Sequence, residues 1–176
     1  MLSKRDELIA ALFRETDRAQ RMKTALAVVL FGIDDWAGWQ RKLEKQELAE
    51  VEQEITARTA RLLRCYDMMQ RYSDGEFGLV LPGCNSFNAV GMAERLRLTV
   101  FGTAIRTGHR YLTLSACYGI AGSGGRSPLV VLRNAENAIS KARACGAGSI
   151  ERSSYDSEPD PAMLLMPVIE DEALHW

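Results

Sequence analysis

An arginine and an aspartate three residues apart, Arg64 and Asp67, precede the polar turn Ser73-Asp74-Gly75 by five residues. A guanidinium can form paired hydrogen bonds with a phosphate or with the Hoogsteen edge of guanine, and a carboxylate can accept from guanine N1 and N2. The two side chains therefore offer chemistry suited to a guanine nucleotide. A solvated ion pair at a helix end is the alternative, because this pair of residues is common at this spacing.

The composition fits a single globular domain with a sizeable core, since 47% of the 176 residues are apolar and 26% are charged. The net charge of -1 provides no overall positive field, so we expect no nucleic-acid partner. No apolar run approaches the roughly 20 residues of a membrane span, and the charged segment Ser3–Glu7 is not typical of a signal peptide. These features predict a cytoplasmic protein without membrane insertion.

The cysteines lack the close pairing of a metal or redox motif. We expect buried, reduced thiols rather than disulfides or a zinc site, because only His109 and His175 could join the cysteines as metal ligands. The four cysteines are Cys65, Cys84, Cys117 and Cys145.

Hydrophobic periodicity places the arginine and aspartate between a helix and a strand. A first helix begins near Ser3 and has one apolar face, formed by Leu8, Leu12, Ala19 and Met22. The apolar run from Ala25 to Phe31, bounded by Gly32, predicts a central strand buried on both faces. Helical spacing from Trp36 onward predicts one long helix that ends at Arg64.

The second half of the chain continues the alternation of strands and helices. Two strands, Met68–Tyr72 and Phe77–Leu81, flank the polar turn as a β-hairpin. The later elements are a helix over Ser86–Val100, a strand over Tyr111–Ile120, a flexible loop at Gly122–Gly125, a helix over Pro128–Cys145 and a short strand around Ile150. This order predicts an α+β domain with a mainly antiparallel central sheet flanked by helices.

The run Arg71-Tyr72-Ser73-Asp74-Gly75-Glu76-Phe77 resembles the signature turn of GGDEF domains, the diguanylate cyclases that make cyclic di-GMP from GTP. The resemblance extends from about Leu8 to Ile150 and implies the palm-like fold of nucleotidyl cyclases. Other segments carry it in the right order: Leu30–Asp34, Ala93–Arg97, Ser115–Ala121 and Ala135–Ala138. We expect residues 1–152 to form a degenerate GGDEF domain, followed by a linker and an apolar and acidic tail over residues 153–176.

The resemblance implies that the cyclase chemistry has been lost. Cyclisation needs two divalent cations held by oxygen ligands, yet Gly32 and Gly75 stand at the family's two metal-ligand positions. Gln40 and Ala49 stand at its guanine-reading positions. Nearby carboxylates could rebuild a metal site only through a costly shift of register, because neighbouring side chains of an extended segment point to opposite faces. These are Asp34, Asp35, Asp74 and Glu76. We therefore expect no catalytic residue, no metal ligand and no cofactor.

The same resemblance implies that the family's allosteric product site is kept. Arg64 and Asp67 match its Arg-x-x-Asp motif, and Arg95 stands at its third ligand-binding position. Arg18, with Arg21 close by, lies where relatives use a basic residue of a second domain to complete the site. An exposed arginine on a charged helix is the equal alternative for Arg18.

The sequence thus predicts a catalytically inactive receptor for cyclic di-GMP that signals to an unknown protein partner and forms a ligand-induced homodimer. A divergent diguanylate cyclase using GTP and magnesium is one alternative, and an interaction module without nucleotide binding is another. The tail contains the apolar run Met163–Ile169 and the acidic residues Glu170–Glu172. It either packs on its own domain, lacks fixed structure, or docks to a partner.

Overall fold

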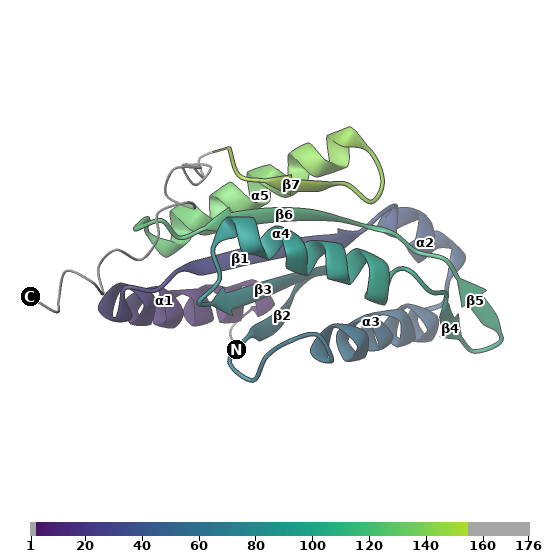
Figure 1. Cartoon of the computed structure of the whole chain (residues 1–176). Coiled ribbons are helices and arrows are strands. Elements are labelled where there is room, and N and C mark those ends of the chain that lie inside the picture. Colours follow the sequence, from purple (N-terminus) through teal and green to yellow (C-terminus); the bar gives the residue numbers. More distant parts are fainter. Residues whose placement is uncertain (1–2, 155–176) are drawn as a thin grey trace, which may run out of the picture.

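The computed structural model describes residues 3–154, which form a five-stranded sheet with helices on both faces (Figure 1). The strand order is β2-β3-β1-β6-β7, and only the β6–β7 pair is parallel. The elements are α1 (Lys4–Met22), β1 (Leu26–Ile33), α2 (Trp36–Lys42), α3 (Lys45–Ala60), β2 (Met68–Ser73), β3 (Glu76–Pro82), α4 (Ser86–Arg95), a π-helical turn (Leu96–Val100), β4 (Ile105–Thr107), β5 (Arg110–Leu112), β6 (Ala116–Gly122), α5 (Pro128–Cys145) and β7 (Ile150–Arg152).

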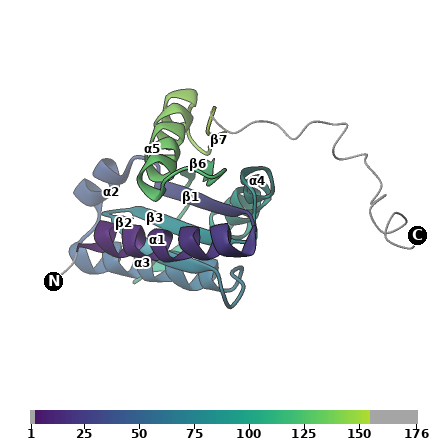
Figure 2. The same cartoon turned by 90° about the vertical axis from the view of Figure 1, so that its left-hand side faces the viewer.

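The central strand β1 separates two apolar layers. Its alternate residues point to opposite faces, and all eight are buried, as the continuous apolar run predicted. One layer packs on α3 and α4, and the other packs on α1 and α5. Figure 2 shows α4 and α5 on either side of β1 and β6. The mainly antiparallel α+β architecture is therefore confirmed.

The prediction of one helix from Trp36 to Arg64 is wrong, because the chain breaks this helix in two and ends it at Ala60. Leu43 and Glu44 have extended backbone angles, with ψ values of 149° and 160°. Glu44 forms a capping box with Glu47. The helix α3 therefore begins as a separate helix, with capping hydrogen bonds for the N–H groups of its own first turn. Arg64 consequently lies in the connection that leads from α3 into β2.

The prediction of one strand from Tyr111 to Ile120 is also wrong. Residues 110–112 pair with residues 105–107 in a separate two-stranded sheet, and β6 begins only at Ala116. The expected helix Ser86–Val100 is α-helical to Arg95 and π-helical beyond it. All four thiols are free, but only Cys84 and Cys117 are buried, so the expectation of burial fails for Cys65 and Cys145.

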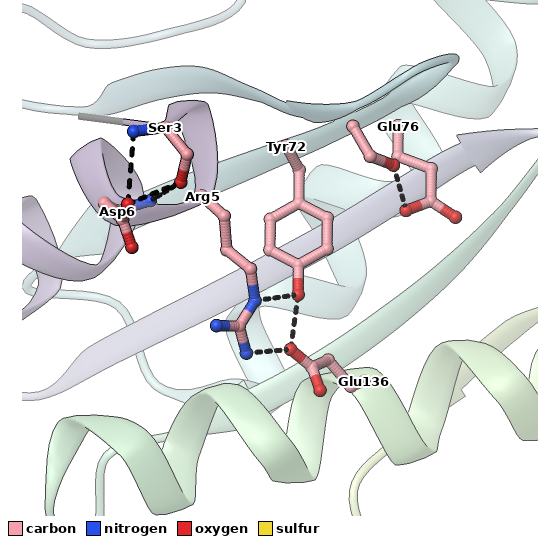
Figure 3. A network of polar contacts seen from close by, with 7 residues as sticks. Ser3, Arg5, Asp6, Tyr72, Glu76 and Glu136 are labelled. Carbon is pink, nitrogen blue, oxygen red and sulfur yellow. Dashed lines mark hydrogen bonds and ion pairs between the residues drawn. The ribbon is translucent and has the colours of Figure 1, made fainter. Parts of the chain in front are cut away.

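The hairpin formed by β2 and β3 is tied to the helices on both sides of it. Figure 3 shows the hydroxyl of Tyr72, on β2, donating to Glu136 of α5 and accepting from Nε of Arg5 in α1. On the other side, Nε of Arg71 lies 2.5 Å from the carboxylate of Glu52 in α3. These contacts fix the direction in which the hairpin tip points.

The predicted tail over residues 153–176 lies outside the described residues except for Ser153 and Ser154. Ser153 is buried, and its backbone N–H donates to Ile120 O over 2.7 Å, which extends the pairing of β7 with β6. Between residues 3 and 154, none of the helices has the length and apolar character needed to cross a membrane.

Candidate nucleotide-binding site

Arg64 and Asp67 close a tight turn between α3 and β2. The backbone N–H of Asp67 donates to Arg64 O over 3.0 Å, and the Asp67 carboxylate accepts from the backbone N–H of Arg64 over 2.8 Å. The same carboxylate accepts from Arg64 Nε over 3.2 Å and from Nη2 over 3.1 Å. The sequence-predicted pair is therefore a doubly hydrogen-bonded ion pair.

The rest of the Arg64 guanidinium is held by two further neighbours. Nη2 also donates to Pro82 O at the end of β3 over 3.1 Å, and Cζ lies 4.6 Å from the centroid of the Tyr66 ring. The hydrogen bonds that Arg64 donates to the Asp67 carboxylate raise the pKa of Arg64, so this side chain stays charged. Its side chain nevertheless remains 46% exposed.

Arg64 borders two separate hollows, and each contains a second arginine. The hollow of about 250 Å³ is lined by Arg18 of α1 together with Arg64 and Tyr66. The hollow of about 220 Å³ is lined by Arg95 of α4 together with Arg64 and Cys84. Within residues 3–154, neither Arg18 nor Arg95 forms an ion pair. The structure thus gathers all four sequence-predicted residues at one end of the sheet.

The spaces beside Gly32 of β1 and Gly75 of the hairpin tip are taken by side chains of α5 and α2. A Cβ on Gly32 would lie 2.5 Å from Nη2 of Arg143, whose guanidinium is paired with Glu76. A Cβ on Gly75 would lie 2.6 Å from Cγ of Trp36. Among the residues that the structure describes, no group of three His, Cys, Asp or Glu side chains is arranged to hold a metal ion.

Three of the four carboxylates named from the sequence, those of Asp34, Asp74 and Glu76, have partners of their own. Asp34 accepts from Ser115 Oγ over 2.5 Å and from the backbone N–H of Gly148 over 2.9 Å, which joins β1 to the segments before β6 and β7. Asp74 accepts from Arg71 over 2.7 Å. Glu76 accepts from Ser73 Oγ over 2.6 Å in addition to its pairing with Arg143.

A larger hollow of about 750 Å³ lies between α2, α3 and the hairpin, and the sequence did not reveal it. Gln40 and Ala49 both line it, and the resemblance to GGDEF domains had placed these two residues at positions that read guanine. Its polar wall includes Glu52, where burial raises the pKa of the carboxyl against the lowering effect of Arg71. Trp36 and Phe77 contribute an apolar wall.

A five-stranded, mostly antiparallel sheet with helices on both faces and a hairpin at its edge defines a palm-like domain of the nucleotidyl-cyclase type. The chain belongs to the GGDEF diguanylate cyclase family, whose domain model matches residues 1–149. The response regulator PleD of Caulobacter vibrioides is 28% identical over 105 residues, which make up 57% of this chain and 23% of PleD. The chain therefore spans about a quarter of the length of the curated relatives that it matches.

Solved structures from two organisms resemble this fold closely. The diguanylate cyclase SiaD of Pseudomonas aeruginosa, in complex with its activator SiaC, has 25% identity and a TM-score of 0.78, over 84% of this chain and 57% of SiaD. The GGDEF domain of YfiN (TpbB) from the same organism has 22% identity and a TM-score of 0.80, over 86% and 96% of the two chains. The GGDEF domain of DgcB from Caulobacter crescentus, in complex with c-di-GMP, has 18% identity and a TM-score of 0.78, over 85% of this chain and 90% of the DgcB chain.

Proposed function

We propose that this GGDEF domain is a receptor for cyclic di-GMP and does not synthesise it. The observation that carries the proposal is the arrangement around Arg64, because a fixed cation borders two hollows that each contain a further exposed arginine, Arg18 or Arg95. A dianionic ligand with two phosphodiesters and two guanine bases matches a shared arginine with one further arginine in each adjoining hollow. The ligand bound by the GGDEF domain of DgcB adds support from within the family.

The second part of the proposal, the loss of synthesis, is supported at the hairpin tip. Neither Gly32 nor Gly75 supplies an oxygen ligand, and the space beside them is occupied by Arg143 and Trp36. A cyclase must hold divalent cations against the triphosphate of its substrate. We infer that no catalytic metal binds here and that the domain passes its ligand state to a protein partner.

We also propose a cytoplasmic location, since all four thiols are free. A divergent cyclase using GTP and magnesium is the second candidate, favoured by the hollow that Gln40 and Ala49 line. An interaction module without nucleotide binding is the third.

Calorimetric titration of the whole chain with cyclic di-GMP, and separately with GTP and magnesium, distinguishes the receptor, the cyclase and the interaction module. We expect micromolar or tighter affinity for cyclic di-GMP and weaker binding of GTP. Arg64→Ala should weaken cyclic di-GMP binding severely, because the variant removes the cation shared by both hollows, and Asp67→Ala should weaken it as well.

Arg133→Ala is the matched control, because Arg133 is an exposed arginine of α5 that lines neither hollow. Its affinity should equal that of the wild type. Wild-type affinity in the Arg64→Ala, Asp67→Ala double variant would remove Arg-x-x-Asp as the ligand site. Tighter binding of GTP with magnesium than of cyclic di-GMP would favour the cyclase.

A further inference from the structure

The charges of the chain are divided unevenly between its first 154 residues and those that follow. All 22 lysines and arginines and 17 of the 23 acidic residues lie in residues 1–154, which therefore carry a formal charge of +5. Residues 155–176 contain six acidic residues and neither lysine nor arginine, so their formal charge is -6. The opposite charges favour contact between the two parts of the chain.

The last described strand lies at an edge of the five-stranded sheet. β7 pairs with β6 on one side, and no strand of residues 3–154 lies on its other side (Figure 1). All three residues of β7 are only partly buried. Because an edge strand presents backbone N–H and C=O groups on its outer side, β7 can accept a sixth strand.

Two helices flank this edge, one in each layer. In the α4 layer, the ring of Phe87 is 54% exposed, and Cζ of Arg152 on β7 lies 5.8 Å from its centroid. In the α5 layer, a hollow of about 310 Å³ separates the helix from the end of β7. Val130, which is 43% exposed, lies one turn before Asn134 on the same face of α5. The lining of the hollow includes Asn134, Asn137, Lys141 and Ser153.

The segment Met163–Ile169 suits this edge. It contains no charged or polar side chain, so it offers apolar groups to both layers, as β1 does. Pro167 lacks an N–H donor, which is tolerated in a strand that itself becomes the edge of the sheet. Acidic residues lie on both sides of the segment in the sequence, and Lys141 and Arg152 place positive charge beside β7.

The length of the connection determines the direction of pairing. Eight residues lie between Ser154, the last described residue, and Met163. A connection of this length can reverse the chain into an antiparallel pair, whereas parallel pairing requires a crossover of a dozen or more residues. Pro159 and Pro161, which favour turns, lie within the connection.

We propose that Met163–Ile169 adds a sixth, antiparallel strand to the sheet, beside β7 of its own chain. One set of alternate side chains covers Phe87, and the other set fills the hollow beside Asn134 and Lys141. The strand lies beyond residues 1–149, which match the family model, so it is an addition to the family's domain. This inference does not depend on the proposed function, because the docking involves no nucleotide.

Hydrogen–deuterium exchange of the whole chain without ligand, followed by mass spectrometry, tests the added strand. The backbone amides of Met163–Ile169 should exchange at least about tenfold more slowly than those of an unstructured peptide of the same sequence, because strand pairing protects them. Phe87→Ser should remove most of this protection, since it removes apolar surface that the segment covers. Leu165→Asp should remove it as well and should speed exchange in β7, whose outward amides lose their partners.

Two variants serve as matched controls and should leave the protection unchanged. Tyr111→Ser replaces an aromatic side chain that is 71% exposed on the separate two-stranded sheet, and Ala173→Asp adds a carboxylate outside the apolar segment.

Three results would overturn the proposal. The first is exchange of Met163–Ile169 at the rate of the unstructured peptide. The second is protection that both Phe87→Ser and Leu165→Asp leave intact, since the segment would then lie elsewhere. The third is protection found only at concentrations at which light scattering detects a dimer, which would assign the edge of β7 to a second copy of the chain.

Discussion

Gly75, at the tip of the hairpin, has a left-handed backbone with φ of +71°, and the Trp36 ring lies where its side chain would be. A glycine tolerates this conformation because it lacks a Cβ. The position that the resemblance to GGDEF domains assigns to a metal ligand is thus closed to a larger side chain by both backbone conformation and packing.

We expect Gly75→Asp to lower the free energy of unfolding by about 1–3 kcal/mol, since it combines an unfavourable φ with a collision against Trp36. Gly83→Asp is the matched control, because Gly83 has the same φ of +71° and no heavy atom within 4 Å of an added Cβ. Urea denaturation should show the smaller loss for Gly83→Asp. Equal losses of stability would mean that the Trp36 ring moves aside without an energetic penalty. A smaller effect of Gly75→Asp in a Trp36→Ala background would confirm the collision.

A second prediction at this scale concerns synthesis. The purified chain should make no cyclic di-GMP from GTP with magnesium or manganese, because Gly32 and Gly75 offer no side-chain oxygen. Gly75→Asp alone should not confer activity, since Gly32 still faces the guanidinium of Arg143. Chromatography of the reaction mixture provides the measurement. Product above that of a heat-killed sample would show that the enzyme alternative is correct.

At the scale of elements, Arg58 joins α3 to the end of the π-helical turn. Its guanidinium donates to the carbonyl groups of Val100 over 2.8 Å and Ala104 over 2.9 Å, and its Nε donates to Glu54 over 2.9 Å. The side chain is only 15% exposed. Arg58 therefore satisfies carbonyl groups at a helix terminus that would otherwise lack partners.

Arg58→Ala should lower the free energy of unfolding by about 2–4 kcal/mol, because it leaves several carbonyl groups without a charged donor. Arg97 lies on the π-helical turn and forms an exposed ion pair with Glu94 of α4. Arg97→Ala should therefore lower the free energy of unfolding by no more than about 0.5 kcal/mol. Urea denaturation of the two variants provides the comparison. Equal effects would show that the carbonyl contacts of Arg58 add nothing to stability.

At the scale of the molecule, the candidate site lies at one end of the sheet, beside exposed apolar side chains. Met22 and Tyr66 are 61% and 47% exposed, and both line the hollow that contains Arg18. A ligand held by Arg64 could also reach a second copy of the chain at this exposed end. The structure places Arg18 beside Arg64 of its own chain.

We predict that cyclic di-GMP promotes dimerisation, because a ligand that binds the dimer more tightly shifts the equilibrium towards it. Light scattering should show the mass rising towards twice that of the monomer on addition of ligand. Arg18→Ala should reduce this rise and leave binding at Arg64 detectable, whereas Arg133→Ala should leave the rise intact. A constant mass at saturating ligand would mean that Arg18 acts within one chain or within a dimer that already exists.

The sequence by itself determined the fold class, the buried central strand and the hairpin, and it supplied the residues proposed for the site. These features depend on local signals: an unbroken apolar run for β1, a polar turn for the hairpin, and fixed spacing to that turn for Arg64 and Asp67. The break at Leu43–Glu44 was missed because the helical periodicity of the sequence continues through it. The small β4–β5 sheet was missed because the apolar residues that follow Arg110 run on into β6 in the sequence.

Only the tertiary structure decided how the site is arranged. The burial of the Asp67 side chain, the use of Pro82 as an acceptor and the position of Arg18 and Arg95 in two hollows depend on strands and helices that are distant in sequence. The filling of the spaces at Gly32 and Gly75 by Arg143 and Trp36 likewise depends on how α5 and α2 pack. Residue types fix which bonds a side chain can form, but packing determines which of those bonds are already satisfied before a ligand arrives.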